Sequence, residues 1–192
     1  MFMRTMLLTM TLVFAATSSV SPTTLSAQDA WQVVSVPDVW KNPLAGVGGY
    51  SWYRCAVRIP GEWEGRDLSL FSEPVDDARE VYWNGTRVGG AGGFPPNFRS
   101  GLGSESRHKV DPAIVKFGQL NTLAIRVYSS DARTGFNVAA PALFAGDRAM
   151  RFSGTWLFQG GDDPTWAKAD AAFSEKTTRV EVLSAEDRKS VV

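Results

Sequence analysis

Short β-rich runs broken by glycine, proline and asparagine fill the sequence after residue 30, and hardly any stretch shows the three-and-four spacing of an amphipathic helix. Alternating apolar and polar residues are typical of strands that bury one face. The pattern therefore predicts an all-β domain. Its expected strands are residues 31–36, 50–59, 67–72, 79–84, 122–129 and 150–158.

The run at 50–59 alternates most clearly, as expected of a half-buried strand. Because successive side chains point to opposite faces, one half of its residues should face the core and the other half should not. The expected core face carries Tyr53, Cys55, Val57 and Ile59, and the opposite face carries Trp52, Arg54, Ala56 and Arg58.

Two local sequence signals, one for a turn and one for a helix, lie between the expected strands. The pair Asn84-Gly85 tolerates the positive φ angles of a type I′ turn, so it predicts a hairpin. The segment 111–118 begins with Asp-Pro, suited to a cap and a first helical residue, and ends at Gly118. It predicts the one short helix of the chain.

Residues 1–27 have the composition of a secretory signal peptide, with Arg4 followed by an apolar stretch at 5–16. That stretch is shorter than the roughly 20 residues that span a bilayer. We expect cleavage near Ala27, export to the periplasm or the exterior, and no membrane contact afterwards. A retained membrane anchor is the alternative.

The β-rich pattern ends near residue 160, so we expect one domain at 28–160 and a polar linker or tail at 161–192. The last six residues, 187–192, are what a common sequencing adapter encodes in one reading frame. We interpret them as an artefact and expect the natural protein to continue beyond Glu186. An ordinary polar tail is the alternative.

Charge and cysteine content exclude several classes of partner and stabilising bond. Lys plus Arg and Asp plus Glu both count 20, so no net field attracts nucleic acid. The single cysteine, Cys55, cannot form an internal disulfide, and its place in an alternating strand predicts a buried thiol. The exported fold must therefore rely on its apolar core.

The order of motifs resembles the sugar-binding domain of glycoside hydrolase family 2 over residues 31–158. The resemblance implies a jelly-roll β-sandwich of the galactose-binding type. Similar modules occur in β-galactosidases, β-glucuronidases, β-mannosidases and some sialate esterases, so the fold alone does not choose a reaction. The motifs are WQVVSVPDVW, GYSWYRCAVRIPGEWEGRDLSLF, VDDAREVYWNGTRVGGAGGFPP, HKVDPAIVKFGQLNTLAIRVY and GFNVAAP.

The resemblance also implies sugar-binding residues. Asn84 matches a position that reaches a neighbouring catalytic barrel in the β-galactosidase branch, although the hairpin turn alone also explains it. The loop after 122–129 brings an acid toward the sugar in that branch, and here it offers Asp131, with Asn137 as a polar substitute. Exposed aromatic residues could stack on sugars, and the candidates are Trp52, Trp83 and Phe94.

The residues do not suggest catalysis by the chain itself. Glycoside hydrolysis needs two carboxyl groups about 5 to 10 Å apart, whereas Asp76 and Asp77 are adjacent and would point to opposite faces of a strand. The single histidine, His108, has no serine-hydrolase motif beside it, and one His with one Cys cannot close a zinc site. We expect no cofactor. A calcium ion on Asp76, Asp77, Asp162 or Asp163 is the alternative to ordinary surface acids.

These observations predict a non-catalytic sugar-binding module of an exported glycoside hydrolase of the β-galactosidase kind, whose partner is a carbohydrate or the chain's own catalytic domain. Two alternatives remain open. One is a free-standing carbohydrate-binding module, and the other is a structural accessory domain of a larger exported esterase or haem-containing oxidoreductase.

Overall fold

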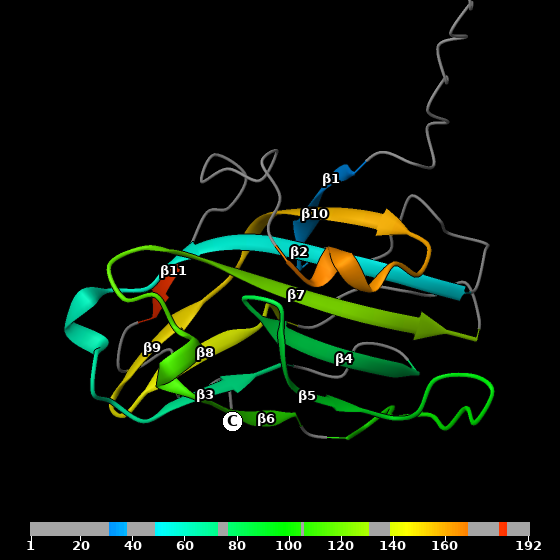
Figure 1. The fold of residues 1–192 in the computed structure, drawn as a ribbon, viewed down its shortest axis with the longest axis horizontal. Helices are drawn as coiled ribbons and strands as arrows, with labels where there is room; N and C mark the ends of the chain where they lie inside the picture. The colour runs from blue at the N-terminus through cyan, green and yellow to red at the C-terminus, as the bar shows by residue number, and fades with distance from the viewer. Residues whose placement is uncertain are drawn as a thin grey trace, which may run out of the picture.

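The computed structural model describes residues 31–37, 49–72, 77–104, 106–130, 139–168 and 181–183, which form two antiparallel sheets packed face to face (Figure 1). The six-stranded sheet has the order β1 (Gln32–Val36), β10 (Gly154–Gly160), β2 (Gly49–Arg58), β7 (Leu120–Ser129), β4 (Ala78–Trp83) and β5 (Thr86–Ala91). The five-stranded sheet has the order β11 (Glu181–Leu183), β9 (Arg148–Arg151), β8 (Ala142–Ala145), β3 (Leu68–Phe71) and β6 (Arg107–Val110). The predicted all-β sandwich is confirmed.

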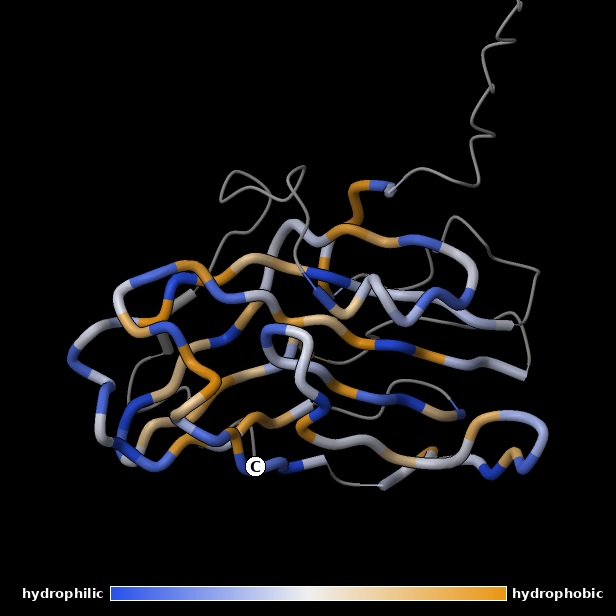
Figure 2. The backbone as a smooth tube through the Cα atoms, in the orientation of Figure 1, coloured by the Kyte–Doolittle hydropathy of each residue, from blue (hydrophilic) through white to orange (hydrophobic). Residues whose placement is uncertain are grey.

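The longest pairing joins β2 and β7, from Gly49 opposite Ser129 to Arg58 opposite Leu120. Hydrophobic and hydrophilic residues alternate along these strands, so one set of side chains faces the space between the sheets (Figure 2). The predicted core face of β2 is confirmed, because its members belong to the main buried cluster. They are Tyr53, Cys55, Val57 and Ile59.

Burial also fits the expectation for the thiol. Cys55 is fully buried, and desolvation raises its pKa well above the usual value. The thiol therefore stays protonated and acts as a small apolar core residue.

Several local elements differ from the prediction. The single strand expected at 150–158 is two strands in different sheets, because the chain crosses between β9 and β10 at Phe152 and Ser153. The short strands β6 and β8 were not anticipated by their composition. The helix expected at 111–118 is a single 3-10 turn, η2 (Pro112–Ile114), although the Asp111 side chain does cap it by accepting a hydrogen bond from the Ala113 N–H.

The outer face of β2 is covered, which corrects the expectation of a half-buried strand. Trp52 and Arg54 are 0 % and 1 % exposed. The 3-10 helix η3 (Pro164–Ala167) packs there and places Ala167 against Trp52 and Ala124. The first part of the expected linker is therefore a layer of the fold.

Arg54 and the indole of Trp31 complete this covering layer. The Arg54 guanidinium lies 4.0 Å from the Trp31 ring centroid, and its Nη1 donates to the Lys168 carbonyl at 2.7 Å. Trp31 also meets Trp166 edge to face, with ring centroids 5.5 Å apart.

None of the described helices is long and apolar enough to cross a membrane.

Candidate functional site

One end of the sandwich collects a loop and several aromatic side chains. Strand β2 begins there at Gly49, opposite Ser129 at the end of β7, and β4 begins there at Ala78. The turn after β5 folds back at the same end through a bridge between Gly93 and Arg99. We call this end, with the described residues 92–104, the loop end.

Four aromatic rings pack together at the loop end. Tyr50 and Phe94 are nearly parallel, with centroids 5.7 Å apart and 8° between their planes. Tyr128 contacts Tyr50 at 5.1 Å and Phe98 at 5.4 Å. Phe98 is 39 % exposed, and Leu102 in the same loop is 69 % exposed. We call Tyr50, Phe94, Phe98 and Tyr128 the aromatic cluster.

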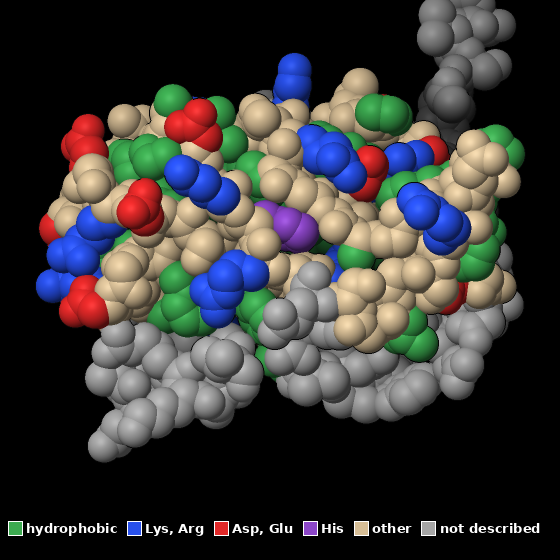
Figure 3. All heavy atoms as spheres, turned by 90° about the horizontal axis from the view of Figure 1, so that it is seen from below, with side chains coloured by type: hydrophobic (Ala, Val, Ile, Leu, Met, Phe, Trp, Pro, Cys, Tyr) green, Lys and Arg blue, Asp and Glu red, His purple; other side chains and the backbone are tan. Residues whose placement is uncertain are grey.

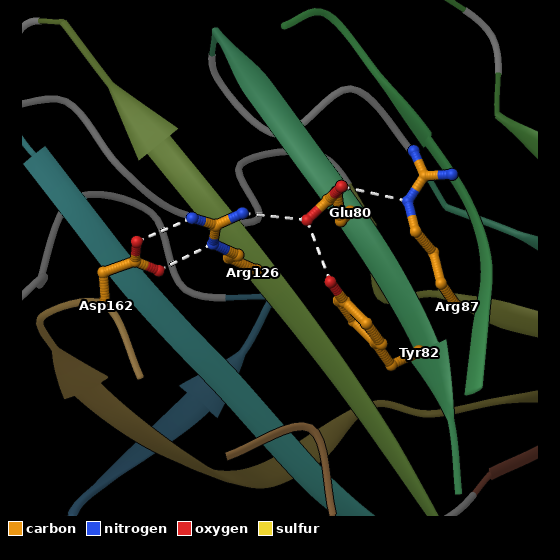
Figure 4. Close-up of polar contacts among 5 residues, drawn as sticks. All are labelled: Glu80, Tyr82, Arg87, Arg126 and Asp162. Carbon is orange, nitrogen blue, oxygen red and sulfur yellow. Dashed lines mark hydrogen bonds and ion pairs between the residues drawn. The ribbon is translucent and has the colours of Figure 1, made fainter. Parts of the chain in front are cut away.

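Arg126 on β7 lies over two rings of this cluster. It also joins two carboxylates, those of Asp162 and Glu80 (Figure 4). Its Nε and Nη2 donate to the two carboxylate oxygens of Asp162 at 2.7 and 2.6 Å, and its Nη1 donates to Glu80 at 3.0 Å. The same guanidinium lies 4.3 Å from the Phe94 centroid and 4.9 Å from that of Tyr50. Both rings therefore have a cation at one face.

Arg126 keeps its positive charge at neutral pH. Burial lowers the pKa of Arg126, but hydrogen bonds to Asp162 and Glu80 outweigh it and raise the pKa above its usual value. Burial, with a hydrogen bond to Glu80, raises the pKa of Tyr82 to about 12. Arg87 also donates to Glu80, at 3.0 Å. Both carboxylates are thus occupied by donors, and this face offers binding surface rather than a free acid.

Asp77 has a positioning role at the loop end. Its Oδ2 accepts hydrogen bonds from the Ser130 N–H, at 2.7 Å, and from the Ser130 hydroxyl. Its Oδ1 accepts from the Ser100 hydroxyl at 3.3 Å, and its carbonyl accepts from the Gly101 N–H. Asp77 therefore ties the start of β4 to the end of β7 and to the loop. Asp76 lies outside the described residues.

Asn84 lies at the opposite end of β4, about 20 Å away at 3.3 Å per residue. Both Asn84 and Gly85 have positive φ, 49° and 84°, as a type I′ turn requires. The Asn84 amide donates to the Ile114 carbonyl and the Asn121 carboxamide oxygen at 2.7 and 2.8 Å, and its Oδ1 accepts from the Thr122 N–H at 2.9 Å. All these bonds are structural.

Asn84→Ala is expected to lower the free energy of unfolding by about 2 kcal/mol, because it removes three hydrogen bonds and because alanine tolerates positive φ less well than asparagine. Urea denaturation measures this loss. Asn84→Gly keeps the turn geometry but loses the bonds, and should be destabilised less. Unfolding midpoints of Asn84→Ala and the native sequence that coincide would contradict the structural role.

The other predicted site residues are dispersed. Trp52 and Trp83 are fully buried, so the expectation that they stack on sugars as exposed aromatics is wrong. Trp83 donates its indole N–H to Asn121 at 3.1 Å inside the core. Phe94 alone is half-buried in a surface cluster. Asp131 and Asn137 lie outside the described residues.

The acids considered for calcium have other partners. Asp162 binds Arg126, and Asp163 caps η3 by accepting from the Thr165 N–H at 2.8 Å. Within the described part of the chain, no three His, Cys, Asp or Glu side chains gather as metal ligands would. The calcium alternative stays a prediction.

His108 on β6 predicts a pH dependence of stability. Burial, then the charges of Arg79 on β4 and Arg87 on β5, lower its pKa below 6.5. The unfolded chain therefore binds the proton more readily, and the stability contributed by neutral His108 is fully present above pH 6.5 and lost as the pH falls toward the lowered pKa. Between about pH 8 and pH 5, the free energy of unfolding should decrease as the pH falls, and it should decrease less steeply in His108→Gln than in the native chain. Equal slopes would contradict this assignment.

Sequence reasoning found Phe94 but missed Arg126 and Glu80, and it considered Asp162 only as a calcium ligand. The alternation of β7 places Arg126 and Tyr128 on the face away from the core, and that of β2 places Tyr50 there. The signal was therefore present in each strand. Their meeting depends on the strand order, which alternation does not supply.

Comparison with known proteins gives distant structural likenesses only. A presumed β-galactosidase from Bacteroides fragilis is 19 % identical, with a TM-score of 0.43 over 65 % of this chain and 18 % of that one. A glycosyl hydrolase family 2 member from Bacteroides cellulosilyticus is 17 % identical, with a TM-score of 0.41 over 71 % and 18 % of the two chains. A β-D-glucuronidase from Dictyoglomus thermophilum is 13 % identical, with a TM-score of 0.41 over 69 % and 37 %.

This chain thus spans less than two fifths of the length of each of those three proteins. No protein-family model matches the sequence. No curated protein matches it either.

Proposed function

We propose that this chain is a non-catalytic carbohydrate-binding module of an exported glycoside hydrolase of the β-galactosidase kind, and that its loop end binds the sugar. The observation that carries the proposal is the aromatic cluster, in which Phe94 lies against the ion-paired Arg126 and Phe98 is exposed beside Tyr128. Aromatic rings provide large, rigid apolar surfaces, which suit the C–H face of a sugar ring. The order of sequence motifs supports the same function.

The exposed apolar residues of the loop end support a place beside a catalytic domain. Leu102 is 69 % exposed on the same loop as Phe98, and a neighbouring domain would cover an apolar side chain there. Ser130, which follows β7, is held at this same end through its hydrogen bond to Asp77. In a longer protein the loop end would then form one edge of a sugar cleft.

The described acids around the loop end favour binding over catalysis. Hydrolysis of a glycoside needs one carboxylic acid and one carboxylate placed on either side of the bond that breaks. Here Glu80 and Asp162 are held by Arg126, and Asp77 is held by Ser130 and Ser100. None of the three is positioned as a free proton donor.

Turnover of aryl glycosides tests the absence of catalysis. The purified chain should release no aryl alcohol from aryl galactosides, glucuronides or mannosides above a protein-free blank. Turnover that disappears in Asp76→Asn or Asp77→Asn would refute the proposal.

Retardation in gels that contain polysaccharide tests the binding. The polysaccharide should slow the migration of the native chain, whereas Phe98→Ala should migrate as fast as it does in a gel without polysaccharide. Val33→Ala is a matched control, because Val33 is 69 % exposed but lies on β1 at the far edge of the sheet. Equal retardation of the Phe98 and Val33 variants would show that the loop end does not bind the polysaccharide.

A further inference from the structure

Arg79 is a buried cation whose charge no described carboxylate balances. Its side chain points between the sheets from β4, like those of Val81 and Trp83, and the residue is 1 % exposed. Its Nη2 donates to the Ser104 carbonyl at 2.9 Å and to the Ser106 hydroxyl. Its Nε and Nη1 are buried and have no hydrogen-bond partner among the described residues. None of the ion pairs among the described residues includes Arg79.

An uncompensated buried charge is expensive. Desolvation lowers the pKa of Arg79 to about 10, so the guanidinium still carries its proton at neutral pH. Removing one partner from a buried ion pair is strongly destabilising, because the remaining charge is left without compensation. Arg79 is in that situation unless an anion accompanies it.

The described side chains nearest to Arg79 include a second hydrogen-bonding group that has no partner, and they include no carboxylate. Ser106 and His108 are two residues apart, so both side chains project from the same face of the β6 segment toward Arg79. The Nε2 of His108 is also buried, with no hydrogen-bond partner in the described part of the chain. Its ring lies over Gly89 of β5, where a β-carbon would be 2.1 Å from Nδ1. Figure 3 shows the His108 ring at the surface where β5 and β6 lie, among several Lys and Arg side chains.

We propose that Arg79, Ser106 and His108 form a binding site for one small monovalent anion, either chloride or a short carboxylate such as acetate. One negative charge would balance the single buried guanidinium, and the Nε, Nη1 and Nε2 groups would supply the hydrogen bonds. Gly89 contributes no side chain, which leaves room for the His108 ring against β5. This site lies between the sheets and is separate from the aromatic cluster.

Nuclear magnetic resonance of the full chain tests the site directly. The Nε–Hε signal of Arg79, assigned with Arg79→Lys, is followed during titration with sodium chloride and with sodium acetate at constant ionic strength. A saturable shift of the Arg79 and His108 signals in either titration supports the site, and the salt that causes it identifies the source of the anion. Shifts that never saturate, or that match those of Arg66, would overturn it. Saturation by inorganic phosphate alone would also overturn it.

Denaturation provides an independent readout. The urea midpoint of the native chain should rise with the effective anion and level off, as binding to the folded state requires. Arg79→Met keeps the side-chain length, removes the charge, and should lose this response. Arg66→Met, at an exposed arginine, should retain it. If Arg79→Met does not fold, the titration of the native chain decides the question alone.

Discussion

Arg126→Met is expected to lower the free energy of unfolding by roughly 3 kcal/mol. The Arg126 side chain is 18 % exposed, and it pairs with Glu80 and Asp162, which are 19 % and 32 % exposed. Methionine keeps much of the apolar stem but leaves Asp162 without its two guanidinium donors. Glu80 retains Arg87 and Tyr82 as partners, so Asp162 should account for most of the loss.

Arg66→Met is the matched control. Arg66 pairs with Asp147 at 3.1 Å, but their side chains are 37 % and 79 % exposed, and such pairs contribute about 0–1 kcal/mol. Urea denaturation of both variants gives the comparison. A double-mutant cycle of Arg126→Met with Asp162→Asn should show coupling above roughly 1 kcal/mol. Equal losses for Arg126 and Arg66, or no coupling, would mean that the network does not hold the loop end.

Gly101→Ala is expected to destabilise the fold by at least about 3 kcal/mol, or to prevent folding. A β-carbon at residue 101 would lie 2.5 Å from the Gly92 nitrogen and 2.7 Å from the Ala91 carbonyl carbon. Both are backbone atoms, so a rotamer change cannot relieve the contact. The Gly101 N–H also donates to the Asp77 carbonyl, which would be displaced.

Gly61→Ala separates this clash from the general effect of replacing glycine. A β-carbon at Gly61 would meet nothing within 4 Å, so alanine should leave stability unchanged or raise it by about 0.4–1 kcal/mol. Urea midpoints measure both. If Gly101→Ala and Gly61→Ala unfold at the same urea concentration, residue 101 does not lie as close to β5 as described here.

Local patterns predicted the features that depend on local geometry. The Asn84-Gly85 turn follows from two residues that accept positive φ, and the core face of β2 follows from its alternation. The burial of Trp52 could not be predicted in this way. It depends on η3, which comes more than one hundred residues later and packs on the outer face of the same sheet.

The candidate site was only partly visible for the same reason. The sequence indicates Phe94 only as one of several aromatic residues that could stack on sugars. Its surroundings come from β2, β4 and β7, and the Arg126 side chain joins them only when these strands lie in the observed order. Alternation gives the face of each residue but not its neighbour on the next strand.

Chemical-shift mapping with oligosaccharides tests the central claim most directly. The native chain, labelled with nitrogen-15, would be titrated with galactose-, glucuronic acid- and mannose-containing oligosaccharides. We predict saturable shifts confined to the loop end, at Tyr50, Phe94, Phe98 and Tyr128, which are lost in Phe98→Ala. Shifts that gather around the Asn84 turn instead, or no saturable shift with any of the sugars, would contradict the account.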